Sequence, residues 1–225
     1  MNQPFYVAPE QLMKDRADYA RKGIARGRAL VAVQYHDGIV VVAENTSNTL
    51  RKVSEIYDRI GFAGVGKYNE FDQLRRFGVR NADVRGYQYS RDDVEARSLA
   101  NEYAQILGQT FTHDVKPYEV EILLVEVGVD QETDQLFHIM YDGTLMDELG
   151  LSVLGGDAES IGERLRSSWK SEDDLSTAVK KCVAALSGPE RTLYAGDLEI
   201  AVLARNAQRR CFLRFDDVEV GKLLS

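Results

Sequence analysis

The chain has 225 residues, of which 44% are hydrophobic and 28% charged, with a formal net charge of −8. This length and composition fit one soluble globular domain with a core of its own. The acidic balance argues against a nucleic-acid-binding surface as the main function, and no stretch reaches the ~18 apolar residues that a membrane span needs.

The N-terminus argues against a secreted protein, and the cysteines and histidines argue against a metal-binding protein. The first eight residues contain neither a basic region nor a long apolar run, so we expect no secretory signal. Cys182 and Cys211 are isolated and match no metal spacing, and His36 and His138 have no cysteine or carboxylate at ligand spacing. We therefore expect no metal, no cofactor, no disulfide and a cytoplasmic location.

An amphipathic helix over residues 9–26 is the first predicted element. A proline suits its first turn, and a glycine follows its end. Its apolar residues recur at helical spacing, at Met13, Ala17, Ala20 and Ile24. A β-hairpin follows directly, with strands over 29–35 and 39–45 joined by an Asp37-Gly38 turn.

The remaining elements alternate between blocks of strands and pairs of helices. In chain order we expect a buried strand over 54–66, helices over 68–77 and 91–109, strands over 118–129, 136–141 and 152–154, helices over 158–169 and 173–186, and strands over 198–204 and 211–215. Ser90 is a good N-cap for the second of these helices. This order suggests two packed sheets with helices outside them.

Several short segments match one known family in the right order. They are Asp18–Gly27, Lys52–Gly66, Lys67–Phe71, Arg85–Tyr87 and Lys116–Glu119. Together they resemble the α subunit of the bacterial, actinobacterial-type 20S proteasome. The resemblance implies an α+β fold, the four-layer αββα sandwich of N-terminal-nucleophile hydrolases, with an extra N-terminal helix. It also implies a gate segment over 1–8 and a single α-type domain over 9–225.

Catalytic members of this family begin their first strand with a free Thr, whose hydroxyl attacks while its own amine acts as the base. The equivalent position here is Arg28, which is internal and carries no nucleophile. Glu44 falls about where the family's catalytic acid lies, and Lys52 where its catalytic lysine lies. We expect a non-catalytic subunit. Two alternatives stay open: an active amidohydrolase of this fold, or a binding module of this fold that does not assemble.

The resemblance also assigns a candidate docking site for an activator. Lys52 would pair with the activator's C-terminal carboxylate between neighbouring subunits. Gly27 matches a glycine that lines the same pocket. Lys67 stands where archaeal relatives have an apolar residue, and a second ammonium would favour a more acidic or differently shaped peptide end. The alternative for Lys52 is an ordinary surface or intrachain salt bridge, which contributes little.

Two further segments are candidates for control of a pore. The candidate gate residues are Pro4, Phe5, Tyr6 and Val7. The candidate pore-loop residues are Thr112, His113, Asp114 and Val115. For the first segment the alternative is a frayed terminus, and for His113 it is a loop histidine without a special role.

The implied partners follow from the family. They are identical α subunits in a seven-membered ring, a proteasome β subunit, a ring-shaped proteasomal ATPase and tagged protein substrates, with no nucleic acid and no membrane. By the same resemblance, the outer α rings template assembly, narrow the entrance and receive the ATPase.

Overall fold

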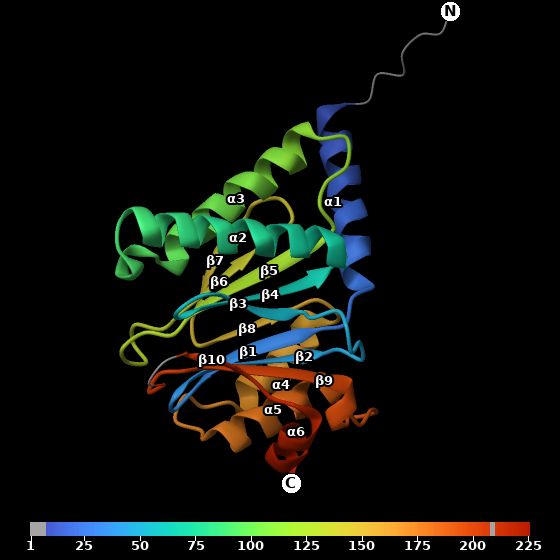
Figure 1. The fold of residues 1–225 in the computed structure, drawn as a ribbon. Helices are drawn as coiled ribbons and strands as arrows, with labels where there is room; N and C mark the ends of the chain where they lie inside the picture. The colour runs from blue at the N-terminus through green and yellow to red at the C-terminus, as the bar shows by residue number, and fades with distance from the viewer. Residues whose placement is uncertain (1–7, 208–209) are drawn as a thin grey trace, which may run out of the picture.

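Two antiparallel sheets lie face to face in the computed structural model, which describes residues 8–207 and 210–225 (Figure 1). The first sheet has the strand order β10-β9-β2-β1-β8 and contains β1 (Leu30–Tyr35), β2 (Gly38–Glu44), β8 (Leu151–Leu154), β9 (Leu198–Ala204) and β10 (Phe212–Arg214). The second has the order β3-β4-β5-β6-β7 and contains β3 (Val53–Tyr57), β4 (Ile60–Gly66), β5 (Val120–Glu126), β6 (Gln135–Ile139) and β7 (Leu145–Glu148).

Helices cover the outer faces of both sheets. The helices are α1 (Pro9–Ala25), α2 (Tyr68–Gln88), α3 (Ala96–His113), α4 (Ala158–Ser168), α5 (Leu175–Ser187) and α6 (Asp217–Leu224), with short 3₁₀ turns η1 (Arg91–Asp93) and η2 (Ala195–Asp197). Helices α2 and α3 pack on the second sheet, and α4 and α5 on the first (Figure 1). The predicted four-layer αββα sandwich is therefore confirmed.

The alternation of side chains along each strand produces three apolar layers. In β1, Leu30 and Ala32 point into the core between the sheets, whereas Val31 and Val33 point toward the α4–α5 layer. A third cluster fills the space between the second sheet and α2–α3. Strands β1 and β2 are apolar on both faces because each face is covered.

The helix predicted over residues 9–26 is present as α1, and it lies across one end of the sandwich (Figure 1). Its buried residues, Ala20 and Ile24, belong to the core between the sheets. The helix packs against strands β4 and β5. This contact fixes the direction in which the chain enters β1.

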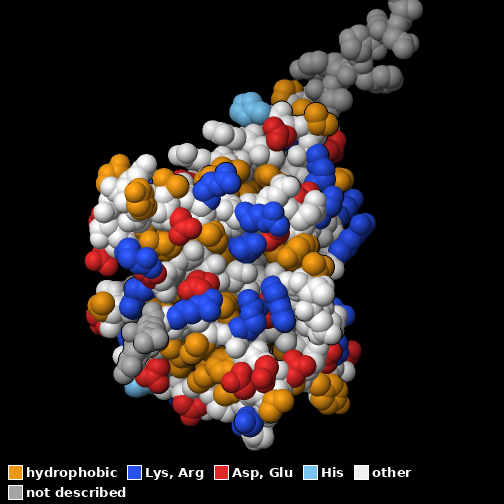
Figure 2. Space-filling model, viewed as in Figure 1, with side chains coloured by type: hydrophobic (Ala, Val, Ile, Leu, Met, Phe, Trp, Pro, Cys, Tyr) orange, Lys and Arg blue, Asp and Glu red, His pale blue; other side chains and the backbone are white. Residues whose placement is uncertain are grey.

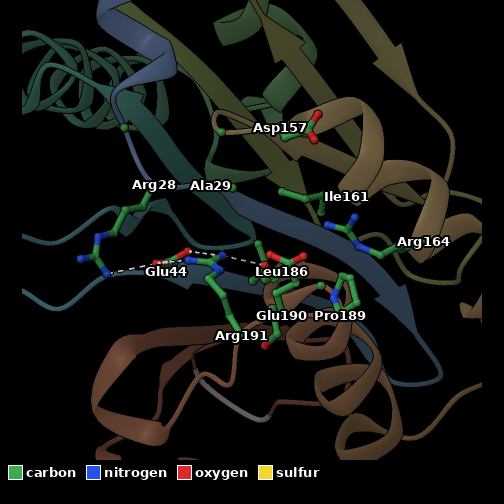
Figure 3. Close-up of a pocket in the computed structure, with 14 residues that line it drawn as sticks. Arg28, Ala29, Glu44, Asp157, Ile161, Arg164, Leu186, Pro189, Glu190 and Arg191 are labelled. Atoms are coloured by element: carbon green, nitrogen blue, oxygen red, sulfur yellow. Dashed lines mark hydrogen bonds and ion pairs between the residues drawn. The ribbon is translucent and has the colours of Figure 1, made fainter.

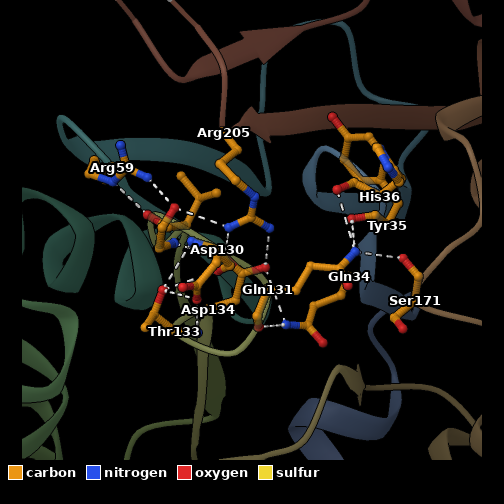
Figure 4. Close-up of polar contacts among 12 residues, drawn as sticks. Gln34, Tyr35, His36, Arg59, Asp130, Gln131, Thr133, Asp134, Ser171 and Arg205 are labelled. Carbon is orange, nitrogen blue, oxygen red and sulfur yellow. Dashed lines mark hydrogen bonds and ion pairs between the residues drawn. The ribbon is translucent and has the colours of Figure 1, made fainter.

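The opposite end of the sandwich is closed by the loop between β5 and β6 (Figure 4). The amide of Gln131 donates hydrogen bonds to the carbonyls of Tyr35 (3.3 Å) and Ser171 (2.9 Å). Asp134, which is fully buried, accepts two hydrogen bonds from Arg205, at 2.8 and 2.9 Å. These contacts join the second sheet to the β1–β2 hairpin and the end of β9.

Several predicted boundaries in the middle of the chain are wrong. Residues 54–66 form two strands, because the chain turns at Asp58 and Arg59 and returns as β4. Helix α2 continues past Phe77 to Gln88. Its continuation includes Gly78, where an added Cβ would collide with the Tyr103 hydroxyl, so glycine here lets α3 approach closely instead of ending the helix.

Three other differences concern short elements. Ser90 caps a 3₁₀ turn, and α3 begins only at Ala96. Strand β7 and helix α6 were not predicted. Strand β7 is a partly exposed edge strand of four residues, and α6 opens with a capping box between Asp216 and Glu219.

The described residues contain no helix that is long and apolar enough to cross a membrane. Cys182 and Cys211 are both buried and free. Burial raises the pKa of both thiols.

Candidate functional site

Three residues meet where the chain enters the first strand. Arg28 follows the end of α1 and precedes β1, so it is internal to the chain. Its guanidinium donates a hydrogen bond of 3.0 Å to the Glu44 carboxylate. The ammonium of Lys52 donates a hydrogen bond of 2.6 Å to the Arg28 carbonyl. The structure thus brings together Arg28, Glu44 and Lys52, which the sequence resemblance equates with a nucleophile, an acid and a lysine.

The Glu44 carboxylate is nearly buried and is held by a second arginine. Arg191 donates to both of its oxygens, at 3.1 and 3.2 Å, and also to the Leu186 carbonyl at 2.9 Å. With two guanidinium partners, this carboxylate is occupied as an ion-pair acceptor. The sequence analysis missed Arg191, because it comes from a loop 147 residues further along the chain.

A second buried carboxylate fixes the backbone at Lys52. Glu199 accepts hydrogen bonds from the backbone amides of Lys52 (2.8 Å) and Val53 (3.3 Å) and from the Asn45 side chain (2.7 Å). Arg214 pairs with the same carboxylate. Glu199 was also missed, although a glutamate inside the apolar run of β9 is a signal of a buried polar partner.

The charge state of Lys52 follows from this environment. Burial lowers the pKa of its ammonium to about 8, against the opposing effect of Glu44 and Glu199 and with a further lowering by Arg28. A lysine of this kind resembles the base-tuning lysine of an N-terminal-nucleophile site. It has no nucleophile to serve, because position 28 carries a guanidinium and an acylated backbone nitrogen.

An open pocket of about 530 Å³ adjoins this cluster (Figure 3). Its charged lining residues are Arg28, Glu44, Asp157, Arg164, Glu190 and Arg191. The three arginines and three carboxylates balance in charge. Asp157 is engaged as the N-cap of α4, where it accepts a hydrogen bond from the Ser160 amide. The pocket is therefore a mixed-charge hollow.

Comparisons with known proteins agree on one family. A family model described as Proteasome subunit matches residues 24–203. A curated relative named Proteasome subunit alpha, from Acidimicrobium ferrooxidans, is 58% identical over 224 residues, an alignment that covers 100% of this chain and 97% of the relative. Relatives of the same name from Kineococcus radiotolerans and Thermomonospora curvata are 52% and 51% identical, each over 100% of this chain and 99% of the relative. This chain belongs to the proteasome subunit family.

The subunit type predicted from the sequence is confirmed as well, since these relatives are all named as α subunits. This α-subunit name of the relatives agrees with the residues found around position 28 of the chain. In this proteasome subunit an internal arginine precedes the first strand. Glu44 accepts hydrogen bonds from Arg28 and Arg191, and the ammonium of Lys52 donates to the Arg28 carbonyl.

The three candidate docking residues lie on adjoining segments of this proteasome subunit. The carbonyl of Lys52 accepts a hydrogen bond from the Gly64 amide at 3.0 Å, which ties the lysine to β4. A Cβ added at Gly27 would stand 3.2 Å from the Gly66 nitrogen, so the end of α1 and the end of β4 are in close contact. Lys67 follows directly, is half exposed and lies 3.8 Å from the Glu70 carboxylate.

The candidate pore-loop residues divide between a helix and a loop. Thr112 and His113 form the last turn of α3, where the Thr112 hydroxyl donates to the Gly108 carbonyl at 2.8 Å. Only Asp114 and Val115 leave the helix, and Val115 is fully exposed. The prediction of a four-residue loop is thus corrected to a helix end followed by a short loop. The Asp114 carbonyl accepts a hydrogen bond from Arg16 of α1, which anchors the loop.

The candidate gate residues Pro4, Phe5, Tyr6 and Val7 lie outside the described residues. In the part that the structure describes, no group of three or more histidine, cysteine or carboxylate side chains is arranged to hold a metal ion.

Proposed function

We propose that this protein is the ring-forming α subunit of a bacterial 20S proteasome core particle. Seven copies would form an outer ring that templates assembly with a β subunit, narrows the entrance and receives a ring-shaped ATPase in the cytoplasm. Position 28 carries the proposal, because a catalytic subunit would expose a free Thr there and this chain has an arginine preceded by a packed helix.

Helix α1 supports this reading over that of a hidden hydrolase. Ala20 and Ile24 fill part of the core between the sheets. Cleavage before Arg28 would therefore expose this apolar surface to water, at a free-energy cost of about 25 cal/mol per Å². The new terminus would carry neither a hydroxyl nor a thiol. An α1 that remains attached is consistent with a structural subunit.

The docking role of Lys52, Gly27 and Lys67 has its own physical basis. An ammonium has three donors, and one of those on Lys52 is used by the Arg28 carbonyl. The others can meet a C-terminal carboxylate of the ATPase. Lys67, which directly follows β4, adds a second positive charge to the proposed site, and the absent side chain of Gly27 lets the end of α1 approach the end of β4.

Control of the pore is the remaining part of the proposal. Residues 1–8, with the aromatic and apolar Pro4, Phe5, Tyr6 and Val7, would converge at the ring axis as a gate, and residues 9–225 would form the single α-type domain. Asp114 and Val115, projecting from the end of α3 beside α1, suit a constriction just inside it. The substrates would be tagged, unfolded proteins delivered by the ATPase.

Negative-stain electron microscopy of the purified chain, with and without its candidate β subunit, tests this function. Seven-fold rings that stack into barrels are the expected result. Monomers in both samples would instead favour a binding module of the same fold. An intact mass that reveals a processed N-terminus beginning with Thr, Ser or Cys would revive the hydrolase alternative.

A further inference from the structure

The segment that carries the candidate pore-loop residues is fixed to the rest of the molecule by one ammonium. Lys116 directly follows the exposed Val115. Its ammonium donates hydrogen bonds to Oε1 of Glu70 at 2.7 Å and to the Pro117 carbonyl at 3.0 Å. It also lies 2.9 Å from the Glu119 carboxylate. An ammonium has three donors, so these three oxygens use all of them. The end of the exposed loop is therefore held in place at this ammonium.

Glu70, in the first turn of α2, is the centre of these contacts. Its side chain is only 11% exposed, and its second oxygen accepts a hydrogen bond of 2.7 Å from the backbone amide of Glu119. The helix dipole further stabilises a carboxylate at this end of a helix. Burial lowers the pKa of Lys116, but the hydrogen bonds and charges of Glu70 and Glu119 outweigh burial, so the pKa is raised and the ammonium stays charged. One nearly buried carboxylate thus joins the start of α2 to the segment that follows the loop.

The same oxygen of Glu70 has a second cationic neighbour, the candidate docking residue Lys67. The Lys67 ammonium lies 3.8 Å from Oε1, the atom that accepts the hydrogen bond from Lys116. The backbone supports this arrangement, since the Lys67 amide donates to the Glu119 carbonyl at 2.9 Å. The Lys67 side chain is half exposed, so a partner can reach it. Two positive charges at one oxygen repel each other, so the charge of Lys67 opposes the contact that holds Lys116.

Helix α1 packs on the same group of charges. A Cβ added at Gly23 would collide with the Glu119 side chain, so this carboxylate lies directly against the helix. The Lys116 ammonium lies 5.6 Å from the centroid of the Tyr19 ring, within the range of a cation–π contact. Figure 2 shows Lys and Arg side chains gathered along α1. Their positive charge favours the approach of an anionic group to this part of the surface.

We propose that Glu70 is a positioning residue that couples the candidate docking residue Lys67 to the candidate pore loop. A partner carboxylate that pairs with Lys67 neutralises the charge that this lysine presents to Glu70. Lys116 is then held by Glu70 against less repulsion, and the loop of Asp114 and Val115 becomes less mobile. The docking part of this inference rests on the proposed function, whereas the link between Lys67, Glu70 and Lys116 is a property of the single chain.

A nitroxide spin label on the loop of the full chain tests this link. Val115→Cys receives the label at an exposed position, and the chain without this substitution should take up none, because both native cysteines are buried. Electron paramagnetic resonance gives the ratio of immobilised to mobile label. Lys67→Gln removes the competing charge and should raise this ratio about twofold, the size expected for a half-exposed ion pair. Lys22→Gln, at an exposed lysine of α1, is the control and should change nothing.

Two further variants separate the link from a direct effect of Lys67 on the loop. Lys116→Met keeps an unbranched side chain but removes the ammonium, so it should lower the ratio of immobilised to mobile label. In this background Lys67→Gln should have no further effect. Glu70→Gln keeps the shape of the side chain but removes its charge, and it should abolish the effect of Lys67→Gln in the same way. The proposal is refuted if Lys67→Gln leaves the ratio unchanged in the otherwise native chain, or raises it equally in either background.

The assembled particle distinguishes this inference from the proposed function. Addition of the ring ATPase to labelled rings should raise the immobilised fraction. Lys116→Met should remove that response and leave the apparent ATPase affinity unchanged. Binding of the ATPase without a response of the label would refute the coupling and leave docking standing. Rings that bind no ATPase would refute the docking function, and the comparison of variants in the single chain would still decide whether Glu70 links the two lysines.

Discussion

The ammonium of Lys52 lies 2.6 Å from the backbone carbonyl of Arg28, where it donates a hydrogen bond. The sequence resemblance equates Arg28 with the position at which catalytic subunits of this family carry their nucleophile, and Lys52 with their lysine. The hydrogen bond to Arg28 uses one of the three donors of this ammonium, which leaves donors for a carboxylate of a partner.

The first prediction concerns the loss of this ammonium. Lys52→Ala should leave ring assembly and small-peptide turnover near wild-type values, but should weaken ATPase-dependent protein degradation. Losing one hydrogen bond to a charged group costs about 1.5–3 kcal/mol, which corresponds to at least a tenfold loss of apparent ATPase affinity. The measurement is degradation of a tagged protein as a function of ATPase concentration. Lys180→Ala is the control, and normal degradation by the Lys52 variant would exclude the docking role.

The second prediction is a pH dependence of docking. Because the pKa of Lys52 is lowered to about 8, the fraction of charged ammonium falls as the pH rises from 7 to 9. Binding of a carboxylate needs the charged form, so ATPase-stimulated degradation should decrease over this range. Lys52→Arg keeps its charge throughout the range and should flatten the profile. Equal profiles for the wild type and this variant would show that the ammonium does not contact the activator.

The third prediction concerns the gate. Deleting Met1–Val7 should raise small-peptide turnover by the assembled particle, because the apolar segment would no longer obstruct the axis. Turnover should be measured on particles of verified barrel shape, so that a change in assembly is not read as a change in gating. Unchanged turnover in intact barrels would argue against a gate in this segment.

The regular parts of the fold could be predicted from the sequence because their signals are local. The β1–β2 hairpin follows from alternation and an Asp-Gly turn, and α1 from its spacing of small apolar residues. The hairpin of β3 and β4 was missed because its turn at Asp58 and Arg59 contains neither glycine nor proline. The predicted helix ended too early because a glycine such as Gly78 commonly ends a helix. In the structure Gly78 lies inside α2 and makes room for the Tyr103 side chain.

The candidate site was predictable only in part for a similar reason. Lys52 and Glu44 were proposed through family resemblance, and the structure places both beside Arg28. Arg191 and Glu199 act across gaps of about 147 residues, and no local spacing reveals such partners. The charge state of Lys52 depends on burial and on the charges of Glu44, Glu199 and Arg28, so it could be derived only from the structure.

The fourth prediction tests the ion pair that closes the far end of the sandwich. Asp134 is fully buried, and Arg205 is nearly so. Asp134→Ala leaves the guanidinium without its partner, and breaking a buried pair on one side costs about 3–5 kcal/mol in the free energy of unfolding. The exposed pair of Arg91 and Asp58 is the control, and Arg91→Ala should change the free energy of unfolding much less, because an exposed ion pair contributes little. Denaturant titration at one protein concentration measures the free energy of unfolding of both variants. Equal losses in the two variants would mean that burial does not determine how much an ion pair contributes to stability.

The fifth prediction concerns His138, a buried histidine between two carboxylates of neighbouring strands. Its ring nitrogens lie 3.4 Å from Glu121 and 3.9 Å from Glu148. Burial alone would lower its pKa, but the two nearby carboxylates outweigh burial, so the pKa is raised above its ordinary value of 6.5. The folded state therefore holds this proton more tightly than the unfolded chain. The resulting stabilisation is complete below pH 6.5 and is lost as the pH rises through the raised pKa.

The test compares the free energy of unfolding of the wild type and of His138→Gln across pH 6–9. The difference between them should be largest at pH 6 and should shrink as the pH increases. Taking the difference at each pH removes the contribution of Lys52, which acts in the opposite direction: burial lowers its pKa, so stability rises above pH 8. A constant difference between the wild type and His138→Gln would mean that His138 stays neutral in the folded chain and contributes by packing alone.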